Sequence, residues 1–289
     1  MHSFLANPMR HFTTVSGIQN YLREQKLNHN SIGLVPTMGA LHEGHSSLVK
    51  ASLSENDITV TSIFINPVQF DNVEDFKRYP QTLESDLIEL QKLGNTVVFI
   101  PSQQEMYPEK TILRLEFGSL QQEMEGKFRE GHFNGVGIVV GKLFNIIKPD
   151  KAYFGQKDLQ QYAVINQLVK DFSFDVKLRC MPILREDDGL AFSSRNQRLD
   201  AKGRTEAIIF YKSLELAKDL IVEKVSIEEI IVKVQNLFGQ STVDLEYFEI
   251  VDPVSLMPIQ SYNTQTNIAL CIAGRVGKIR LIDNMIISK

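Results

Sequence analysis

Two glycines and two histidines lie close together in the segment 35–46, which reads Val-Pro-Thr-Met-Gly-Ala-Leu-His-Glu-Gly-His-Ser. The segment joins an apolar, β-rich run to a run with helical spacing. Gly39 and Gly44 allow the backbone to approach a ligand closely, and a helix N-terminus offers unpaired N–H groups with a partial positive charge. Both features suit an anionic ligand, most naturally a phosphate, and they place His42 and His45 beside it.

Three sequence motifs compete for this segment. The pattern Gly39-x-x-x-x-Gly44-His45-Ser46 is similar to a P-loop, except that a histidine replaces the lysine that reaches the β- and γ-phosphates. His42 and His45 are three residues apart, whereas the helix of zinc proteases spaces its histidines by four and needs a further ligand. The third motif is the H-x-G-H signature of adenylyl-transferring enzymes, in which both imidazoles face the nucleotide phosphates. Taken alone, the segment is also compatible with a loop that carries two solvated histidines.

Two later segments also offer phosphate-binding groups. Gly155-Gln-Lys-Asp158 follows a strand-like run and opens a helix-like one, and a lysine at a helix start is unfavourable unless an anion offsets its charge. Ser193-Ser-Arg-Asn-Gln-Arg198 offers hydroxyls and a guanidinium fork, a combination that suits phosphate. Each has a plainer interpretation, an exposed lysine in a turn or a hydrophilic linker. Phosphate-suited groups on three separate loops nevertheless favour a nucleotide site.

Neutral amides provide candidates for binding a second, smaller ligand. Asn66 and Gln69 follow a strand-like run, where they could fix hydroxyls or amides of a substrate; an Asn-Pro turn is the alternative. Gln160 and Gln161 could act in the same way or form an exposed pair. Four apolar residues could line such a pocket or belong to the core: Phe64, Phe70, Phe133 and Val139.

The elements that must position these groups alternate between strand and helix. Apolar, β-rich runs predict strands over residues 31–36, 57–65, 95–100 and 151–154. Apolar residues at helical spacing predict helices over 45–53, 83–93, 135–147 and 158–172, the third of them behind an Asn134 cap. This alternation indicates an α/β fold, a Rossmann-like parallel sheet with helices on both faces. In such a sheet ligands bind at the carboxyl ends of the strands, where the phosphate-suited segments are expected.

The sequence changes in character after residue 182. A polar, turn-rich stretch over 185–198 precedes helix-like runs over 201–222 and 226–237. Strand-like runs follow over 244–251, 267–273 and 278–282, the last two joined by a Gly-Arg-Val-Gly turn that predicts a hairpin. We therefore expect two domains, a Rossmann-like nucleotide- and substrate-binding domain over 1–182 and a smaller α+β carboxyl-terminal lid domain over 183–289.

Composition and charge exclude several classes of protein. The chain has 289 residues, of which 43% are hydrophobic and 23% charged, so a disordered, collagen-like or coiled-coil protein is excluded. The formal net charge of −4 disfavours a nucleic-acid partner, which normally requires a basic surplus. Cys180 and Cys271 are the only cysteines, which predicts ordinary core residues in place of a disulfide scaffold or zinc site. No segment has the apolar length of a signal peptide or membrane span, so we expect a cytoplasmic protein without a membrane partner.

Taken together, the motifs resemble the pantothenate synthetase (pantoate–β-alanine ligase) family. The resemblance rests on blocks that follow one another in order over nearly the whole chain, and their order is more specific than any single block. The blocks are residues 36–45, 64–70, 75–80, 106–108, 131–136, 142–145, 154–158, 160–161, 188–196 and 280–284.

The resemblance implies an ATP-dependent ligase that works in two steps. The carboxylate of (R)-pantoate attacks the α-phosphorus of ATP, which gives pantoyl adenylate and pyrophosphate. The amine of β-alanine then attacks the activated carbonyl and releases AMP and pantothenate. Because carboxylate and ATP repel each other, positioned cationic and dipolar donors should dominate catalysis. The alternatives are another H-x-G-H adenylyl or nucleotidyl transferase and a non-catalytic nucleotide-binding protein on the same fold.

The resemblance also implies roles for residues at the matching positions. The expected catalytic residues are His45, His42, Lys157 and Arg195. ATP is expected to contact Met38, Gly39, Ala40, Leu41, His42, Glu43, Gly44, His45, Gly155, Gln156, Lys157, Asp158, Leu184, Phe192, Ser193, Ser194 and Arg195. Pantoate and β-alanine are expected to contact Gln69 and Gln161, with Asn66 in support.

Further expectations concern the metal, the assembly and a few departures from the family pattern. Mg²⁺ should accompany ATP, held mainly by phosphates without a dedicated protein site, with Asp86 as a possible outer ligand. The resemblance implies a homodimer, and we expect closure of the carboxyl-terminal domain to carry Arg195 toward the nucleotide. Four residues depart from the pattern: Leu159, Phe192, and also Ile138 and Gly141, which are expected near the pantoate wall.

Overall fold

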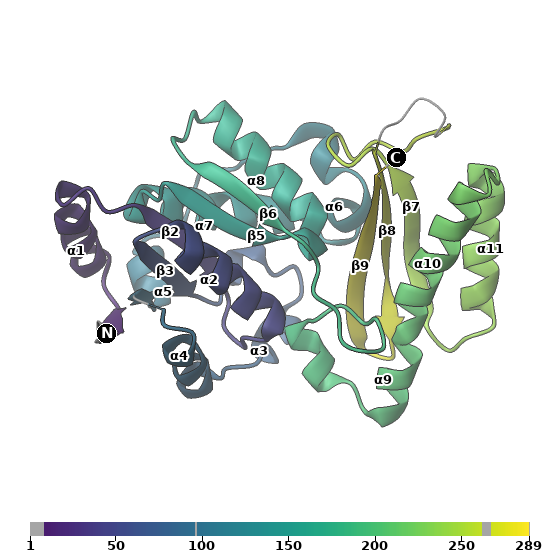
Figure 1. The fold of residues 1–289 in the computed structure, drawn as a ribbon, viewed down its shortest axis with the longest axis horizontal. Coiled ribbons are helices and arrows are strands. Elements are labelled where there is room, and N and C mark those ends of the chain that lie inside the picture. The colour runs from purple at the N-terminus through teal and green to yellow at the C-terminus, as the bar shows by residue number, and fades with distance from the viewer. Residues whose placement is uncertain (1–8, 96, 262–266, 289) are drawn as a thin grey trace, which may run out of the picture.

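The structure of the protein, a computed structural model, describes residues 9–95, 97–261 and 267–288. The first eight residues of the amino-terminal stretch, and Thr96 within the predicted strand over 95–100, lie outside the described residues. Figure 1 shows a larger part built from the amino-terminal elements, with a smaller part beside it that is formed by the last third of the chain.

A six-stranded sheet forms the centre of the larger part. In spatial order its strands are β1 (Arg10–Phe12), β4 (Val97–Phe99), β3 (Ile58–Ile63), β2 (Ile32–Thr37), β5 (Lys151–Gly155) and β6 (Lys177–Met181). Every neighbouring pair is parallel, as predicted. The sequence predicted the four inner strands but missed β1 and β6, because these edge strands carry charged, exposed side chains and lack a long apolar run. Cys180 is exposed on β6, so the prediction of a core residue is wrong there, whereas Cys271 is buried.

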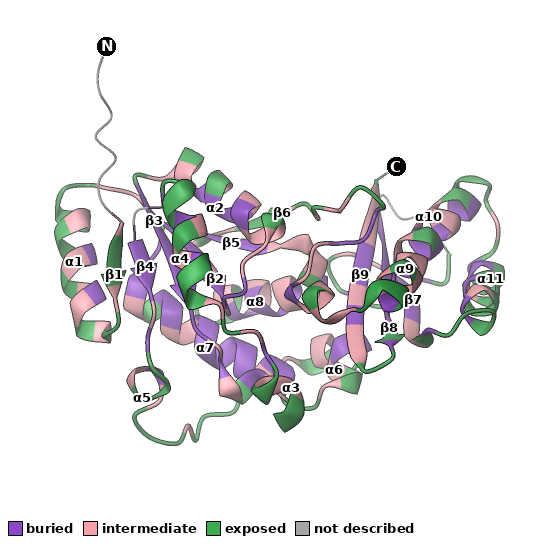
Figure 2. Cartoon of the chain, turned by 90° about the horizontal axis from the view of Figure 1, so that it is seen from below, coloured by how far each residue is buried: buried purple, intermediate pink, exposed green. Residues whose placement is uncertain are grey.

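Helices cover both faces of this sheet. One face carries α1 (Val15–Leu27), α7 (His132–Ile147) and α8 (Leu159–Asp171). The other face carries α2 (Glu43–Glu55) and α4 (Leu83–Lys92). Leu34 packs with the first group and its neighbour Val35 with the second, since side chains alternate along a strand. Figure 2 shows the inner strands buried between these helices, so the predicted layering is confirmed.

Helix α7 begins at His132, earlier than predicted. Gly131 precedes it with a left-handed backbone (φ 74°), so the predicted Asn134 cap is wrong. Asn134 lies inside the first turn, and its side-chain oxygen accepts a hydrogen bond from the backbone N–H of Leu115 at 2.9 Å. Three short helices lie in the connections between the longer elements: α3 (Val73–Lys77) between β3 and α4, and α5 (Gln103–Met106) and α6 (Met124–Phe128) between β4 and α7.

The smaller part contains a three-stranded antiparallel sheet. Its strands are β7 (Asp244–Val251), β8 (Asn267–Val276) and β9 (Ile279–Ser288), and β8 and β9 form the predicted hairpin. The helices that precede it are α9 (Ala201–Glu206), α10 (Ile208–Val222) and α11 (Ile227–Gly239). The single helix predicted over 201–222 is therefore divided at Ala207, whose backbone ends one helix and begins the next.

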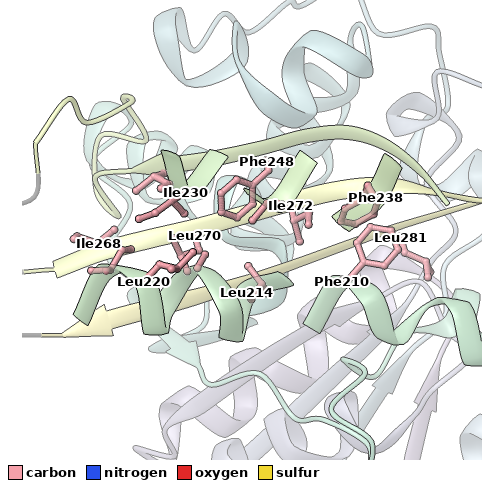
Figure 3. Packing of buried hydrophobic residues seen from close by; sticks show 14 of the residues in the cluster. Phe210, Leu214, Leu220, Ile230, Phe238, Phe248, Ile268, Leu270, Ile272 and Leu281 are labelled. Atoms are coloured by element: carbon pink, nitrogen blue, oxygen red, sulfur yellow. The ribbon is translucent and has the colours of Figure 1, made fainter. Parts of the chain in front are cut away.

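A separate hydrophobic core joins these helices to the antiparallel sheet. Figure 3 shows Phe210 and Leu214 of α10 packed toward Leu270 and Ile272 of β8. The larger part has its own core between the parallel sheet and its helices. Among the described residues, no helix is both long and apolar enough to cross a bilayer.

The order of the parallel strands fixes where a ligand can bind. After β2 the chain adds β3 on one side, and later adds β5 on the other. The loops that follow β2 and β5 therefore diverge, which leaves a crevice at the carboxyl ends of these two strands.

Candidate active site

A cavity of about 210 Å³ lies at the carboxyl ends of β2, β3 and β5. Its walls also include helix α7 and part of the stretch over 182–195. The predicted site residues that line it are Met38, His42, Gly44, His45, Asn66, Gln69, Gly155, Lys157, Asp158, Gln161, Leu184, Phe192, Ser193, Ser194 and Arg195. Five predicted ATP-binding residues do not line it: Gly39, Ala40, Leu41, Glu43 and Gln156.

A buried carboxyl group holds the loop that follows β2. Gly39 and Ala40 have left-handed backbones (φ 79° and 50°), which turn the chain sharply. Asp86 on α4 accepts hydrogen bonds from the backbone N–H of Ala40 at 2.9 Å and of Leu41 at 2.8 Å. The Thr82 hydroxyl donates to the same carboxyl group. Asp86 therefore supports the loop from behind, and the expectation that it is an outer metal ligand is not supported.

The two histidine rings contact each other at the start of α2, tilted by 36°. Their ring centroids are 4.0 Å apart, and α2 begins at Glu43, directly after His42. A side chain at Gly44 would place its Cβ 2.9 Å from the His42 ring, so the glycine of the H-x-G-H motif is needed for this pairing.

The surroundings of both histidines favour the neutral imidazole at pH 7. Burial, together with smaller contributions from the neighbouring His45 and Lys157, lowers the pKa of His42 to about 2. Burial also lowers the pKa of His45 to about 4; Asp158 opposes this shift and Lys157 adds to it. The Nδ1 atoms of both rings are buried without a hydrogen-bond partner among the described residues. Each ring can therefore offer a hydrogen bond to a ligand in this cavity.

Lys157 is a cation whose ammonium group has no partner among the described residues. It lies in a 3₁₀ turn (Gln156–Asp158) between β5 and α8, as the sequence predicted for the start of a helix. Its ammonium group makes no hydrogen bond or ion pair within the part of the chain that the structure describes, and it borders the cavity. Asn284 of β9 fixes this turn, because its amide donates to the backbone carbonyls of Gln156 and Lys157, both at 2.9 Å. Sequence reasoning missed this role, since only a family block, and no spacing, marks Asn284.

The stretch over 193–198 meets the loop after β2. The Ser194 hydroxyl is buried and donates to the carbonyl of Ala40 at 2.9 Å, while Ser193 caps the turn by accepting from the backbone N–H of Arg195. Phe192 lies over His42, with ring centroids 6.2 Å apart. The carbonyl of Leu184 accepts from the Phe192 backbone. The two loops therefore form one continuous wall of the cavity.

The two amide side chains at the other end of the cavity, Asn66 and Gln69, differ in how many hydrogen bonds they already make within the protein. Asn66 is buried, and its side chain bonds to Gln69, to the carbonyl of Gly135 and to the Tyr107 hydroxyl. Among the described residues, the amide nitrogen of Gln69 donates only to the sulfur of Met38, at 3.1 Å. Asn66 is thus fully occupied in holding Gln69, which leaves Gln69 the better placed of the two for a ligand.

The pair Gln160–Gln161 divides its roles. Gln160 is buried and bonds to the backbone of three residues in the segment 120–125. It is therefore not exposed, and its amide is already used within the protein and is not available to a ligand. Gln161 lines the cavity, and its amide makes no hydrogen bond among the described residues. Gln161 is therefore available to a ligand.

One face of α7 supplies an apolar wall. The residues that line the cavity from this helix are Val136, Val139, Val140 and Leu143. Ile138 and Gly141 lie on other faces of the helix and do not line it, so their departure from the family pattern leaves the wall unchanged. Of the four apolar candidates, Phe64 and Val139 line the cavity, whereas Phe70 and Phe133 do not.

No protein metal centre is built into the described residues. They contain no group of three or more His, Cys, Asp or Glu side chains arranged to hold a metal ion. The cavity instead combines the Lys157 ammonium, the Arg195 guanidinium, two neutral imidazoles, two amides and an apolar wall. This combination suits a polyanion next to a small polar molecule with an apolar side.

Comparison with known proteins identifies a family of matching length. The family model described as pantoate-beta-alanine ligase matches residues 10–286. The chain is 46% identical over 277 residues to the pantothenate synthetase of Cytophaga hutchinsonii, covering 95% of this chain and 98% of that protein. It is 47% identical over 280 residues to the pantothenate synthetase of Thermosipho africanus, covering 96% and 100%.

Solved structures agree with these sequence relatives. The pantothenate synthetase of Thermus thermophilus superposes with a TM-score of 0.90 at 38% identity, covering 96% of this chain and 99% of that one. The pantoate-beta-alanine ligase of Francisella tularensis, solved with beta-gamma ATP and β-alanine, gives a TM-score of 0.81 at 36% identity, covering 96% and 97%. The predicted fold class is confirmed, and nothing in these comparisons favours another nucleotidyl transferase or a non-catalytic protein. The chain belongs to the pantoate–β-alanine ligase family.

Proposed function

We propose that the cavity joins pantoate to β-alanine in two steps, with ATP as the activating substrate. In the first step the pantoate carboxylate attacks the α-phosphorus of ATP, and pyrophosphate leaves. In the second step the amine of β-alanine attacks the carbonyl of pantoyl adenylate, and AMP leaves. Family membership supports this reaction, and the Francisella tularensis relative was solved with an ATP analogue and β-alanine.

One observation carries the proposal. The ammonium group of Lys157, which has no partner in the described part of the chain, borders the same cavity as the neutral His42–His45 pair and the amides of Gln69 and Gln161. Such a cation, at a site that also holds neutral donors, is suited to charge that builds up during the reaction. A merely structural lysine would have an internal partner or point into bulk solvent.

The nucleotide is assigned to the end of the cavity with the phosphate-suited loops. His42, His45 and Lys157 would face the phosphates around the reacting phosphorus, and Arg195 would meet the leaving pyrophosphate. Leu184 and Phe192 would contact the adenine side, with Ser193, Ser194, Gly155, Asp158, Met38 and Gly44 completing the pocket. The remaining predicted ATP contacts, Gly39, Ala40, Leu41, Glu43 and Gln156, shape the loops behind it.

Pantoate is assigned to the end with the amides. Gln69 and Gln161 would bind its hydroxyls and carboxylate, and Asn66 would hold Gln69 in place. The two methyl groups of pantoate would pack against Val139 and the rest of the α7 wall, where apolar contact is favourable. β-Alanine would approach next to Gln69 after pyrophosphate has left.

Mg²⁺ enters this proposal with ATP. The described residues form no cluster that could hold a metal by itself, and Mg²⁺ commonly keeps several waters and binds through substrate phosphates and one or two carboxylates. Asp158, which borders the cavity with an exposed carboxyl group, is the nearest candidate for such a contact. When bound, the ion would neutralise part of the phosphate charge.

The organisation around the site is also part of the proposal. Residues 1–182 would form the ATP- and pantoate-binding domain and residues 183–289 the lid, a division supported by the separate core of the smaller part. The family resemblance supports a homodimer and a cytoplasmic location. Light scattering at several protein concentrations tests the dimer, and a scattering profile that contracts with ATP and pantoate tests the lid.

Substrate-dependent AMP formation tests the function. Purified protein with ATP and Mg²⁺ should form AMP in stoichiometry with pantothenate when both acids are present. Omission of either acid should stop turnover, because each step consumes one of them. Sustained ATP turnover that ignores both acids would instead leave a nucleotide enzyme with another acceptor, and would remove the roles given to Gln69 and Gln161.

A further inference from the structure

One carboxyl group beside the cavity bonds two arginines at the same time. Asp75 accepts from Nη2 of Arg195 at 3.0 Å through one oxygen and from Nη1 of Arg198 at 2.8 Å through the other. All three side chains are partly buried, between 22% and 26% exposed. They are therefore less screened by solvent than an ordinary surface ion pair.

The carboxyl group is itself held in place. Asp75 lies in the first turn of α3, and the Asn72 side chain accepts from the backbone N–H groups of Glu74 and Asp75. Burial raises the pKa of Asp75, but the guanidinium groups of Arg195 and Arg198 outweigh this and bring the pKa below its usual value. Asp75 is thus a fixed anion at neutral pH.

The three groups occupy the border between two spaces. Arg195 lines the cavity, and it also lines a neighbouring cleft of about 460 Å³ that contains Asp75 and Arg198. A guanidinium group has five N–H donors, and among the described residues the Arg195 side chain uses only its bond to Asp75. The trio of one carboxylate and two guanidinium groups retains a net positive charge. Asp75 therefore orders two like charges side by side without cancelling them.

We propose that Asp75 is a positioning residue that, with Arg198, holds the Arg195 guanidinium at the edge of the cavity, ready for the phosphates of ATP. This inference rests on the proposed function, because it assigns Arg195 to the nucleotide. A long arginine side chain loses rotamer freedom when it binds a ligand. An arginine already fixed by Asp75 loses less, so the phosphates bind it more tightly.

If Asp75 instead competed with ATP for the arginines, its removal would change ATP binding in the opposite direction. If Asp75 occupied the place of a phosphate, ATP would have to displace it, and removal of its charge would strengthen ATP binding. The positioning role predicts that removal of this charge weakens ATP use, since Arg195 and Arg198 would then repel each other and lose their common anchor. The two roles can therefore be separated by the direction of one change.

The test compares Asp75→Asn with Glu74→Gln. Both variants remove one carboxylate from α3, but Glu74 is exposed, and its ion pairs among the described residues are with Lys77 and Arg78 of its own helix segment. The readout is pantoate-dependent exchange of pyrophosphate into ATP, which reports the adenylation step alone. We expect Asp75→Asn to lower kcat/KM for ATP by about 10- to 100-fold and Glu74→Gln to match the wild type. In the complete reaction, KM for β-alanine should be unchanged in both variants. A tighter KM for ATP in Asp75→Asn, or no change, would overturn the proposal.

A double-mutant cycle shows whether Asp75 acts through Arg195. In the Arg195→Gln background, the addition of Asp75→Asn should cost little more, because the group that it positions is gone. Full additivity of the two losses would contradict the inference. Asp75→Glu, which keeps the charge, should recover part of the activity. If Asp75→Asn does not fold, Arg198→Gln takes its place and should also lower kcat/KM for ATP. A wild-type kcat/KM in Arg198→Gln would reject the proposal.

The same assay separates this inference from the proposed function. Wild-type protein that exchanges pyrophosphate into ATP without any need for pantoate would contradict the function itself. Wild-type protein with normal pantoate-dependent exchange, combined with an Asp75→Asn variant that behaves like Glu74→Gln, would contradict only the role of Asp75.

Discussion

The loop after β2 and the loop over 193–198 both border the cavity, but different contacts hold them. Asp86, with an exposed fraction of only 3%, binds the first loop through backbone N–H groups of Ala40 and Leu41. The second loop is held by its Ser194 hydroxyl and by partly exposed arginine side chains on Asp75. Buried contacts to backbone groups fix the shape of a loop, whereas an ion pair between side chains orders those side chains and leaves the backbone that carries them more freedom. The first loop is therefore a preformed platform, and the second is suited to adjust when the nucleotide binds.

The largest expected effect concerns the cation between the two loops. Lys157→Ala should fold normally, because its ammonium group has no partner among the described residues, yet it should slow adenylation by about 10²- to 10³-fold, the usual effect of removing one preorganised donor. The measurement is pantoate-dependent pyrophosphate exchange, with a thermal melt to check folding. Lys50→Ala, which removes an exposed lysine from α2, is the control. Wild-type exchange in a folded Lys157→Ala protein would remove this residue from the mechanism.

The second prediction tests the rigidity of the platform. Asp86→Ala leaves two backbone N–H groups and the Thr82 hydroxyl without their acceptor. It should lower the free energy of unfolding by about 1–3 kcal/mol, and it should raise KM for ATP. Urea denaturation followed by circular dichroism measures the first effect. Glu84→Ala changes an exposed carboxylate on the same helix and should be neutral. An Asp86→Ala protein as stable as the Glu84 variant would show that other contacts hold the loop.

The fold was predictable where local pattern and burial agree. The inner strands β2, β3 and β5 are apolar runs because helices cover both of their faces. The edge strand β6 has the sequence Lys-Leu-Arg-Cys-Met, which is mostly exposed and carries no such pattern. Its pairing with β5 is a tertiary contact that the local sequence does not encode.

The candidate site was predictable where a motif carries its own geometry. His42, Gly44 and His45 depend on one another locally, because the glycine makes room for the paired histidine rings. Asp86 and Asn284 act on loops that are distant in the sequence, through backbone groups that every residue possesses. No spacing rule identifies such partners, and sequence reasoning therefore did not predict that Asp86 holds the loop after β2 or that Asn284 holds the turn at Lys157.

The third prediction concerns the neutral histidines. The folded pKa of His45, about 4, lies below its ordinary value of 6.5, so the unfolded state binds a proton first as the pH falls. The stability contributed by neutral His45 is therefore complete above pH 6.5 and is lost between pH 6.5 and about 4. His42 and His132 have lowered pKa values as well and add to the same slope.

Denaturation at several pH values measures this loss. His45→Asn should remove about 2 kcal/mol of the decline in unfolding free energy between pH 7 and pH 5, and His11→Asn, at an exposed position, controls for the substitution itself. An identical decline in wild type and His45→Asn would mean that the imidazole keeps its ordinary pKa. In that case His45 would be partly protonated near neutral pH when ATP binds, and water would reach the loop after β2 more freely than its burial indicates.

The smallest expected effect sharpens the contrast between the two loops. Ser194→Ala removes the hydrogen bond to the Ala40 carbonyl, a neutral bond of the kind that contributes about 0.5–1.5 kcal/mol, or roughly 2- to 10-fold in binding. If the second loop adjusts to the nucleotide, this loss should raise KM for ATP while kcat stays close to the wild-type value, as expected for an interaction made equally in ground and transition states. Ser54→Ala, which removes an exposed hydroxyl bonded within α2, is the matched control. A fall in kcat with unchanged KM would instead show that the Ser194 bond is needed only at the transition state, and the loop over 193–198 would then be as preorganised as the platform that it touches.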